Sequence, residues 1–425
     1  MFGCMPPLRC SMPFSIHSSG LFYRAQLQRS ITAASQIGYF SLVRHASLSH
    51  FLPYRSIPRK SATSRESQLA SAILVRHDPC LPSPQLVARG GLTTSAKPVA
   101  HYVPPKTGLI ASLPKSWIPY AELMRLDKPA GTYYLFFPCI FSTLLAAPMA
   151  ENIAGPPEVL GTAGLFFAGA LIMRGAGCSI NDLWDRNLDP HVERTKFRPI
   201  ARKAISPQKA IVFTGAQLLA GLSVLLQFPY QCLWYGIPSL LLVTTYPLAK
   251  RVTYYPQAVL GLTFSWGAIM GFPALGVDLL ANWNALGAAT ALYTSCIAWT
   301  VLYDTIYAHM DIKDDVAAGI KSIALRYRHN TKALLSVLAV TQVSLLAAAG
   351  TAAGAGPIFL VGGCGSAALS LAIMIWRVQL KSVRNCWWWF KNGCLLTGGG
   401  ITLGLFAEYL AQYLGLYKDD TKVEA

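Results

Sequence analysis

The sequence predicts an all-α membrane protein, a bundle of about nine transmembrane helices, and three observations support this class. Of the 425 residues, 53% are hydrophobic and only 13% are charged, which is too apolar for a soluble protein of this length. Apolar runs of roughly 20 residues, the length that crosses a bilayer, alternate with short polar loops. The basic residues between the runs fall in alternate loops, as in a polytopic membrane protein.

The first segment of the chain has the composition of a mitochondrial transit peptide. Residues 1–65 contain no Asp or Glu and many Arg and Ser. A secretory signal would need a compact apolar core, which this segment lacks. Residues 66–114 are rich in Pro, Gly and Ser and show no periodicity, so we interpret them as a disordered linker. The last residues, 418–425, form a polar tail.

The transmembrane domain is predicted at residues 115–417, after the linker. Each apolar run is close to the ~20 residues that a helix needs to span a bilayer, and several contain Gly or Pro, which membrane helices tolerate. The predicted spans are residues 132–149, 158–179, 209–227, 231–249, 255–276, 282–303, 333–353, 356–377 and 393–415. Residues 116–128 are weakly amphipathic and either lie along the membrane interface or simply lead into the first span.

The distribution of charge predicts the orientation of these spans. Between Lys115 and Lys391 every Lys and Arg falls on one side of the membrane, and the opposite loops contain none. By the positive-inside rule the basic side faces the compartment of origin. For a protein of the mitochondrial inner membrane that compartment is the matrix. Both acidic segments described below lie on this side, so we expect the active site there.

Net charge and cysteine content exclude two other classes of protein. The net charge is +17, but it lies in the leader and the loops and forms no basic helix, so we expect no nucleic-acid partner. The ten cysteines include no C-x-x-C pair and no zinc-type spacing. We interpret them as small buried hydrophobic residues in a reducing compartment.

Two acidic segments, about 120 residues apart, each stand at the end of an apolar run. The first reads G-C-S-I-N-D-L-W-D-R-N-L-D and supplies Asn181, Asp182, Asp185 and Asp189. The second reads Y-D-T-I-Y-A-H-M-D-I-K-D-D and supplies Asp304, Asp311, Asp314 and Asp315. Carboxylates beside membrane-spanning sequence are costly unless they are compensated. A divalent cation is the simplest compensation, and such cations commonly hold phosphate.

The spacing of the first segment suggests a shared face. On a helix that advances 100° per residue, Asp182, Asp185 and Asp189 fall within about 60° of arc. Arg174 lies near the same face, about two turns earlier.

If the second segment is helical, Asp304, Asp311 and Asp315 also share one face of the helix. Asp314 has a different helical angle, so we expect it to be solvated. Two such faces meeting in a cavity would repel each other without cations. With Mg²⁺ the carboxylates become ligands, partly through water.

Basic residues near both segments indicate an anionic ligand. They are Arg186, Arg194, Lys196, Arg198, Arg202, Lys203, Lys250, Arg251, Lys321 and Arg326. Aspartates, Mg²⁺ and basic side chains around one pocket have the composition that neutralises a diphosphate leaving group. A cavity within lipid implies a diphosphate with a lipid tail. Taken singly, the loop cations also serve to fix topology. No second His supports a metal role for His191 or His309, which we interpret as bystanders.

The acidic segments resemble those of the UbiA superfamily of intramembrane prenyltransferases. That family carries N-D-x-x-D-x-x-x-D and D-x-x-x-D, which stand here at residues 181–189 and 311–315. Further strings resemble the branch that prenylates 4-hydroxybenzoate in ubiquinone synthesis. They are R-L-D-K-P-A-G-T at 125–132, M-R-G-A-G-C-S-I-N-D at 173–182, R-T-K-F-R-P at 194–199, Y-P-L-A-K-R-V-T-Y-Y-P-Q at 246–257 and G-I-K-S-I-A-L at 319–325. The resemblance covers residues 117–413. Lys203 departs from it, because the family usually has Gly there.

The resemblance implies a nine-helix bundle around a central cavity open to lipid, and it implies roles for the residues singled out above. One Mg²⁺ would be bound by Asp182, Asp185 and Asp189, and a second by Asp311 and Asp315. The diphosphate of an all-trans polyprenyl donor would be bound by these ions and by Arg194, Arg198, Lys250, Arg251 and Lys321, and Asn181 would also bind substrate. Arg174 would hold the carboxylate of 4-hydroxybenzoate, whose ring is prenylated beside its hydroxyl. Membrane lipid and other enzymes of ubiquinone synthesis are the expected partners.

Two other functions remain open from the sequence. Haem farnesyltransferase belongs to the same superfamily, although its second segment should differ from the I-K-D-D-V-x-x-G-I-K-S string found here. An ion-coupled transporter would also use membrane aspartates, although transporters more often have repeated halves with broken helices at mid-membrane.

Overall fold

The computed structural model describes residues 102–105, 108–192, 195–312, 316 and 321–417. All regular secondary structure in the described residues is helical, and these residues contain no β-strand. The α-helices are α2 (Ile118–Leu123), α3 (Ala130–Ala146), α4 (Pro156–Trp184), α5 (Pro207–Leu225), α6 (Gln231–Val252), α7 (Pro256–Phe264), α8 (Gly267–Ala274), α9 (Trp283–Ala308), α11 (Ile323–Arg326), α12 (Thr331–Ala352), α13 (Gly365–Arg377) and α14 (Val383–Tyr413). The all-α prediction is therefore confirmed. The predicted leader, most of the linker and the tail lie outside the described residues.

Seven helical segments in the described part of the chain are long and apolar enough to cross a membrane. They are Ala130–Met149, Pro156–Trp184, Pro207–Leu225, Trp283–Ala308, Thr331–Ala352, Phe359–Arg377 and Val383–Tyr413. Two further predicted spans correspond to α6 and to the pair α7 and α8. The prediction of one continuous helix over residues 255–276 is wrong, because the helix is interrupted between Phe264, where α7 ends, and Gly267, where α8 begins. The count of nine spans stays a prediction.

Burial differs greatly among the spans and shows where the core lies. In α3, 83% of the apolar window is buried inside the protein, compared with 17% in α5. The core is centred on aromatic rings of α3 and α9, where Tyr134 stacks on Tyr303 with ring centroids 3.5 Å apart. The Tyr134 hydroxyl also donates to the backbone carbonyl of Phe390 in α14, at 2.9 Å. Thus α3 is the central helix, and α5 keeps most of its apolar surface outside the core.

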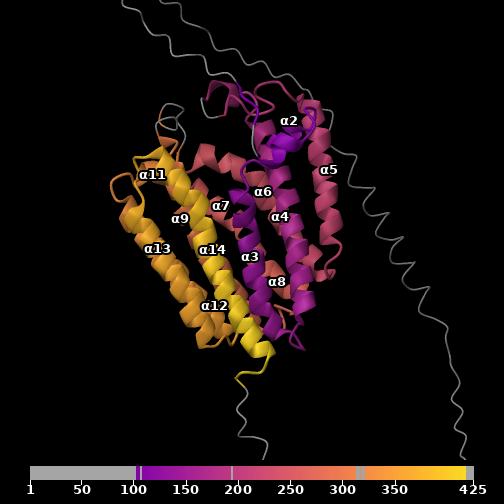
Figure 1. Cartoon of the computed structure of the whole chain (residues 1–425), viewed down its shortest axis with the longest axis vertical. Helices are drawn as coiled ribbons and strands as arrows, with labels where there is room; N and C mark the ends of the chain where they lie inside the picture. Colours follow the sequence, from indigo (N-terminus) through magenta and orange to yellow (C-terminus); the bar gives the residue numbers. More distant parts are fainter. Residues whose placement is uncertain (1–101, 106–107, 193–194, 313–315, 317–320, 418–425) are drawn as a thin grey trace, which may run out of the picture. The chain divides into compact units, whose positions relative to one another are not determined.

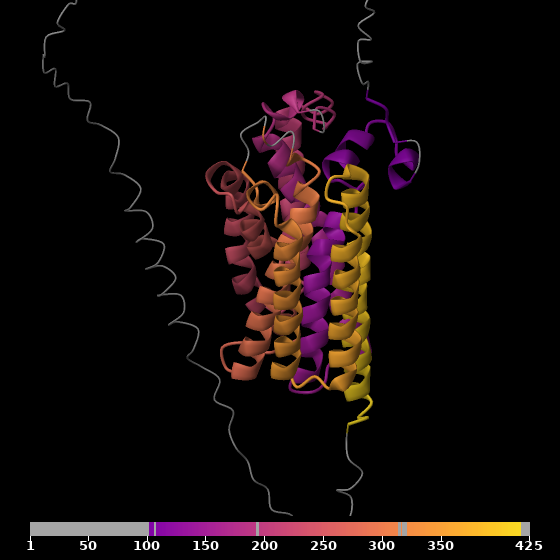
Figure 2. The same ribbon diagram turned by 90° about the vertical axis from the view of Figure 1, so that its left-hand side faces the viewer.

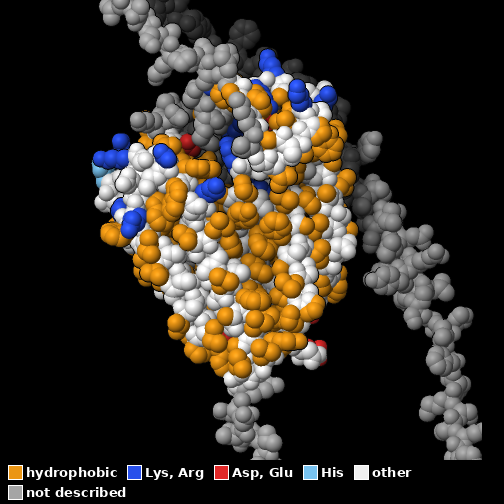
Figure 3. Space-filling model, viewed as in Figure 1, with side chains coloured by type: hydrophobic (Ala, Val, Ile, Leu, Met, Phe, Trp, Pro, Cys, Tyr) orange, Lys and Arg blue, Asp and Glu red, His pale blue; other side chains and the backbone are white. Residues whose placement is uncertain are grey.

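The long helices run side by side, and the segments that follow α4 and α9 lie at one end of the bundle, together with α2 and α11 (Figures 1 and 2). Lys and Arg side chains gather at this same end on the face shown in Figure 3, and the rest of that face is mainly hydrophobic. This arrangement matches the predicted placement of basic loops on a single side.

The acidic segments are less helical than their spacing suggested. Helix α4 ends at Trp184, Asp185 is its C-cap, and Asp189 lies in a short 3₁₀ turn, Asp189–His191. Pro190 has no backbone N–H and disfavours a helical conformation of the residue before it, so a helix does not continue through this segment. The expectation of one helical face for all three aspartates is therefore wrong, although the three remain close in the chain.

Candidate active site

Both acidic segments face one large cavity. The cavity has a volume of about 1760 Å³ and is lined by Asn181 and Asp182 of α4, Asp304 of α9, and Asp311, which follows α9. The sequence prediction that the two segments meet thus agrees with the position of these four residues. From Asp182 the cavity follows α4 to Phe166, which is roughly 24 Å along the helix axis at 1.5 Å per residue.

Away from the aspartates the cavity is apolar and open along α5 and α6. Its lining there includes Leu218, Leu219 and Leu222 of α5, and Ile237 and Leu240 of α6. These side chains are also exposed, with Leu219 at 69% and Ile237 at 50%. Among the described helices α5 packs mainly on α4, with a smaller contact to α2 through Tyr120 and Phe213, and α6 packs mainly on α7 and α8. The cavity can therefore accommodate a long apolar chain that continues into the lipid.

Two arginines hold Asp182 at the polar end of the cavity. The Asp182 side chain is completely buried, and Arg125 donates from Nη2 to its two carboxylate oxygens at 2.7 and 2.9 Å. Arg198 lies 3.1 Å from the same carboxylate. A buried carboxylate needs such partners, because burial without them costs several kcal/mol. Arg125 adopts a left-handed conformation with φ of 59°, which costs a non-glycine residue about 1–3 kcal/mol and is often found at functional sites.

Arg198 also holds Asp189 and so joins two of the predicted metal ligands. Its Nη1 lies 3.1 and 3.0 Å from the two carboxylate oxygens of Asp189. Burial raises the pKa of Asp189 and the Asp182 carboxylate raises it further, whereas Arg198 opposes both effects. The Thr195 hydroxyl donates to the Asp189 backbone carbonyl at 3.0 Å and stabilises this loop. Arg198, predicted as a substrate ligand, thus bridges two aspartates.

The remaining acidic residues are placed differently. Asp304 and Asp311 line the cavity, whereas Asp185 is half-buried at the end of α4 and is not part of the lining. Asp315 lies outside the described residues. Within the described ranges no three His, Cys, Asp or Glu side chains form a ready metal cluster. The lining does supply carboxylate and amide oxygens, the donors that Mg²⁺ prefers, so the donor chemistry at this end of the cavity fits a hard divalent cation.

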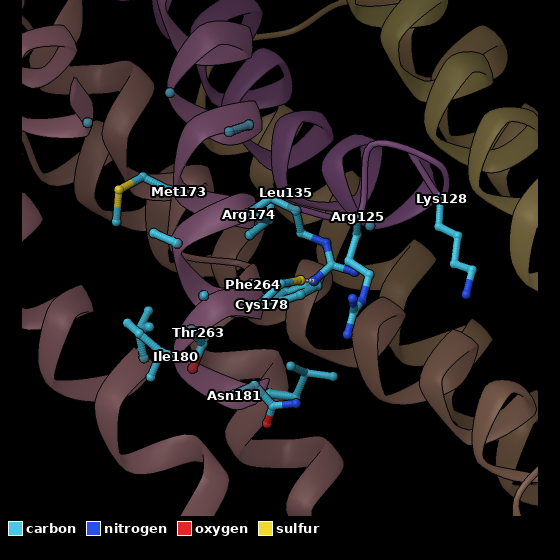
Figure 4. Close-up of a pocket in the computed structure, with 18 of the residues that line it drawn as sticks. Arg125, Lys128, Leu135, Met173, Arg174, Cys178, Ile180, Asn181, Thr263 and Phe264 are labelled. Carbon is cyan, nitrogen blue, oxygen red and sulfur yellow. Dashed lines mark hydrogen bonds between the residues drawn. The ribbon is translucent and has the colours of Figure 1, made fainter. Parts of the chain in front are cut away.

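Arg174 projects into the cavity from α4. Its Nη1 donates to Cys178 Sγ at 2.6 Å, and its buried Nε has no hydrogen-bond partner in the structure. Gly131 at the start of α3 leaves space for it, since a Cβ there would collide with the guanidinium. Figure 4 shows Arg174 and Arg125 approaching the same part of the cavity. A buried N–H without a partner is costly, so this group is available to an anionic ligand.

The structure does not place the other predicted basic substrate ligands in the cavity. Lys321 is absent from the residues that line the cavity, and its ammonium lies 5.2 Å from the ring centre of Tyr254. Arg194 lies outside the described residues, as do the side chains of Lys250 and Arg251 in α6. The His309 Nδ1 donates to the Thr305 carbonyl at 2.9 Å. Its Nε2 lies 3.2 Å from the Thr331 hydroxyl, and this second contact joins the end of α9 to α12 away from the cavity lining.

Sequence reasoning missed Arg125 as a site residue. The available signal was its place in the R-L-D-K-P string, one of the strings that carry the family resemblance. Glu122, Arg202 and Tyr102 also line the polar end of the cavity. Glu122 and Tyr102 were not predicted at the site, and Arg202 was named only as one of the basic residues near the acidic segments. Their sequence neighbourhood gives no such signal, because the contacts that join them connect residues 20 and 80 positions apart.

Comparison with known proteins identifies relatives of the chain. The UbiA prenyltransferase family model matches residues 135–397. The chain is 48% identical over 308 residues to a Saccharomyces cerevisiae protein named "4-hydroxybenzoate polyprenyltransferase, mitochondrial", covering 72% of this chain and 80% of the relative. It is 43% identical over 312 residues to the Rattus norvegicus protein of the same name, covering 73% and 78%.

Solved structures show the same fold at much lower sequence identity. An apo UbiA homolog from Aeropyrum pernix K1 superposes with a TM-score of 0.52 at 20% identity, covering 67% of this chain and 98% of that one. A UbiA homolog from Archaeoglobus fulgidus bound to DMAPP and Mg²⁺ superposes with a TM-score of 0.51 at 16% identity, covering 69% and 98%.

Proposed function

Because this chain belongs to the UbiA prenyltransferase family, we propose that it transfers a polyprenyl group from a polyprenyl diphosphate to the ring of 4-hydroxybenzoate, an early step of ubiquinone synthesis. The observation that carries this proposal is the position of both acidic segments on one cavity whose remaining walls are apolar. Relatives that are 48% and 43% identical are named for this activity, not for haem farnesylation. The family match also argues against an ion-coupled transporter.

The polar end of the cavity suits a diphosphate. Arg125 and Arg198 bring positive charge to the place where the leaving group gains negative charge, and preorganised charges of this kind lower the barrier of bond cleavage. The apolar walls along α5 and α6 would hold the prenyl chain and exclude water, which would otherwise capture the allylic cation. The allylic C–O bond breaks, and its electron pair leaves with the diphosphate.

The acceptor ring then supplies the electron pair for the new bond. The ring carbon beside the hydroxyl bonds to the allylic carbon, and the ring loses its proton from that position. Arg174, with its buried and unpaired Nε, is the residue we assign to the acceptor carboxylate, since a guanidinium binds a carboxylate in a bidentate manner. Asp304 also lines the cavity and is a candidate to accept the phenolic proton.

Divalent cations are part of this proposal. Asp182, Asp185 and Asp189 would hold one Mg²⁺, and Asp311 with Asp315 a second. A bound Mg²⁺ neutralises the diphosphate and so makes it a better leaving group. Asp182 and Asp189 already contact arginines, so these carboxylates would be shared between Mg²⁺ and the guanidinium groups. The homolog solved with DMAPP and Mg²⁺ supports this choice of ion.

The location follows from the same family. The relatives are named mitochondrial, and seven helices in the described part of the chain are apolar enough to span a membrane. We assign the chain to the mitochondrial inner membrane, with residues 1–65 as its transit peptide and the acidic end of the bundle facing the matrix. The leader contains no Asp or Glu, which supports its role as a transit peptide. The basic residues that lie at the same end of the bundle as the acidic segments support the orientation toward the matrix.

The test is turnover in membranes that contain the full chain. Labelled 4-hydroxybenzoate and polyprenyl diphosphates of several lengths should give a prenylated acid whose mass reports the donor. EDTA should abolish the product and Mg²⁺ should restore it. Asp182→Asn and Asp311→Asn should each lower kcat by about 100-fold or more, as loss of a charged group at a reacting diphosphate does.

The matched control is Asp278→Asn, because Asp278 is an exposed residue of the loop between α8 and α9 and accepts hydrogen bonds from Leu280 and Ala281 that Asn can also accept. It should retain activity. Full activity in both Asp182→Asn and Asp311→Asn would contradict the proposed roles, and wild-type membranes that prenylate no 4-hydroxybenzoate with any donor would contradict the function.

A further inference from the structure

A short segment that precedes the helices lies against the polar end of the cavity. Tyr102, Val103 and Pro105 are part of the cavity lining. The Tyr102 hydroxyl donates to Glu122 Oε1 of α2 at 2.6 Å. The guanidinium of Arg202 lies over the Tyr102 ring, 3.7 Å from its centre, within the range of a cation–π interaction. The segment is thus fixed by a hydrogen bond at the hydroxyl and a stacked cation on the ring.

Glu122 joins this segment to the loop that follows α4. It is 8% exposed, and its Oε2 accepts from Arg202 Nη2 at 2.6 Å. Arg202 in turn donates from Nη1 to the Phe197 carbonyl at 2.9 Å. The charges of Glu122 and Arg202 compensate each other, and each is hydrogen-bonded on a second side. A partly buried pair with its remaining donors and acceptors satisfied holds its geometry well.

The two segments joined by this cluster are the ones that carry the arginines of the site. Glu122 also accepts, through its backbone carbonyl, from Arg125 Nη1 at 2.9 Å. Phe197, whose carbonyl Arg202 holds, directly precedes Arg198. Arg125 and Arg198 approach Asp182 from these separate segments. A shift of either segment would therefore move one of the two cations that surround this carboxylate.

We propose that Tyr102, Glu122 and Arg202 form a positioning cluster that fixes Arg125 and Arg198 around Asp182 and thereby sets the affinity for the diphosphate of the donor. The proposal rests on the proposed function for its kinetic consequence, but the cluster itself does not depend on substrate. Tyr102 is a suitable member because burial and the Glu122 carboxylate raise its pKa to about 12. Its hydroxyl therefore keeps its proton, and donates it, throughout the neutral range.

The test compares Tyr102→Phe, Glu122→Gln and the double variant in the full chain. Tyr102→Phe removes one hydrogen bond and leaves the stacked ring, so KM for the polyprenyl diphosphate should rise about fivefold, the usual effect of one hydrogen bond, while kcat stays within twofold. The KM of the double variant should rise less than the product of the two single effects, because both changes weaken the same contact between Tyr102 and Glu122. Amide hydrogen exchange of residues 195–205 should be faster in each variant without substrate.

The matched control is Tyr230→Phe, since Tyr230 is 74% exposed at the start of α6. It should change neither KM nor exchange. An unchanged KM and unchanged exchange in Tyr102→Phe and Glu122→Gln would overturn the proposal. So would a large KM effect of Arg202→Lys with none for Tyr102→Phe, because Arg202 would then bind the donor directly. Amide exchange at residues 195–205 that is slow in the wild type and faster in the variants would support the cluster. This result would hold even if the wild type prenylated a different acceptor, so it tests the cluster separately from the proposed function.

Discussion

At the scale of single residues, the site is organised by unlike charges that come from distant parts of the chain. Asp182 is contacted by Arg125, 57 residues earlier, and by Arg198. Removing one arginine would leave the buried carboxylate with a single partner, and breaking a buried ion pair in this way typically costs about 4 kcal/mol. The left-handed conformation of Arg125 is maintained because these contacts and the Glu122 carbonyl hold its guanidinium.

Lys203, the one departure from the family pattern, also has a left-handed backbone, with φ of 62°. It is exposed, in the turn that leads into α5. Glycine adopts this conformation without the steric cost of about 1 kcal/mol that a side chain has, although glycine loses more chain entropy on folding. We expect Lys203→Gly to stabilise the protein by about 0.5 kcal/mol, and Lys203→Val to destabilise it by about 1 kcal/mol, since β-branched residues tolerate this region poorly.

Thermal unfolding of the purified protein measures this difference. Lys203→Gly should unfold at a temperature slightly above the wild type and Lys203→Val at one clearly below it. Equal melting temperatures for the two variants would show that the turn relaxes when the side chain changes.

Only part of the site could be predicted at this scale. The aspartates stood out because charge next to apolar sequence is rare, and their cavity positions agree with that argument for Asp182, Asp304 and Asp311. Arg125 and Tyr102 did not stand out, because basic and aromatic residues before a first span are ordinary in membrane proteins. Their roles depend on contacts across long sequence separations, which one sequence does not contain.

At the scale of elements, close packing of α8 on α3 supports the wall of the cavity. A Cβ on Gly271 would collide with Ser142 and with the backbone of Thr143. Ser142 Oγ also accepts from the Gly271 amide at 3.0 Å and donates to the Gly267 carbonyl at 2.8 Å. Small residues let membrane helices approach this closely and form such bonds.

Gly271→Ala should therefore lower stability by about 1–3 kcal/mol, the usual effect of overpacking, and should lower the yield of folded protein. The matched control is Gly164→Ala in α4, because no atom lies within 4 Å of a Cβ at Gly164. That change should be neutral or slightly stabilising, since Ala favours a helix over Gly. Melting temperatures in detergent would compare the two, and similar values would contradict the close approach of α3 and α8.

Helix positions were largely predictable, and helix ends and breaks were not. Hydropathy located each of the seven segments that can span a membrane among the described residues, since length and apolar composition are enough for that. The break between α7 and α8 was missed because the residues around Ser265 and Trp266 are as apolar as a continuous span. The start of α14 at Val383, ten residues before the predicted span, was missed because polar residues hide helical sequence outside the apolar window.

At the scale of the whole molecule, charge and polarity separate along the helices. The acidic segments, the arginines of the site and the basic loops share one end, and the turn between α5 and α6 belongs to the other. The cavity thus has a charged end and long apolar walls, which match the diphosphate and the prenyl chain of the proposed donor.

This arrangement predicts opposite accessibility for the two ends of α5. The seven cysteines of the described chain are all buried, so a chain with Cys4, Cys10 and Cys80 replaced by Ser should react little with a membrane-impermeant maleimide. In intact mitoplasts Tyr230→Cys should be labelled, and Lys209→Cys should be labelled only after the inner membrane is opened. Both positions are exposed. Labelling of Lys209→Cys in intact mitoplasts would reverse the proposed orientation.

The contact of Tyr102 with Glu122 has a consequence for maturation. If residues 1–65 direct import, a protease removes the leader, and its cutting site decides whether the chain keeps the contact of Tyr102 with Glu122. Trimming before this tyrosine would keep the contact, whereas trimming beyond it would leave an enzyme that needs more donor to work at the same rate. The position of a single proteolytic cut would then decide how the enzyme responds to a scarce supply of prenyl chains.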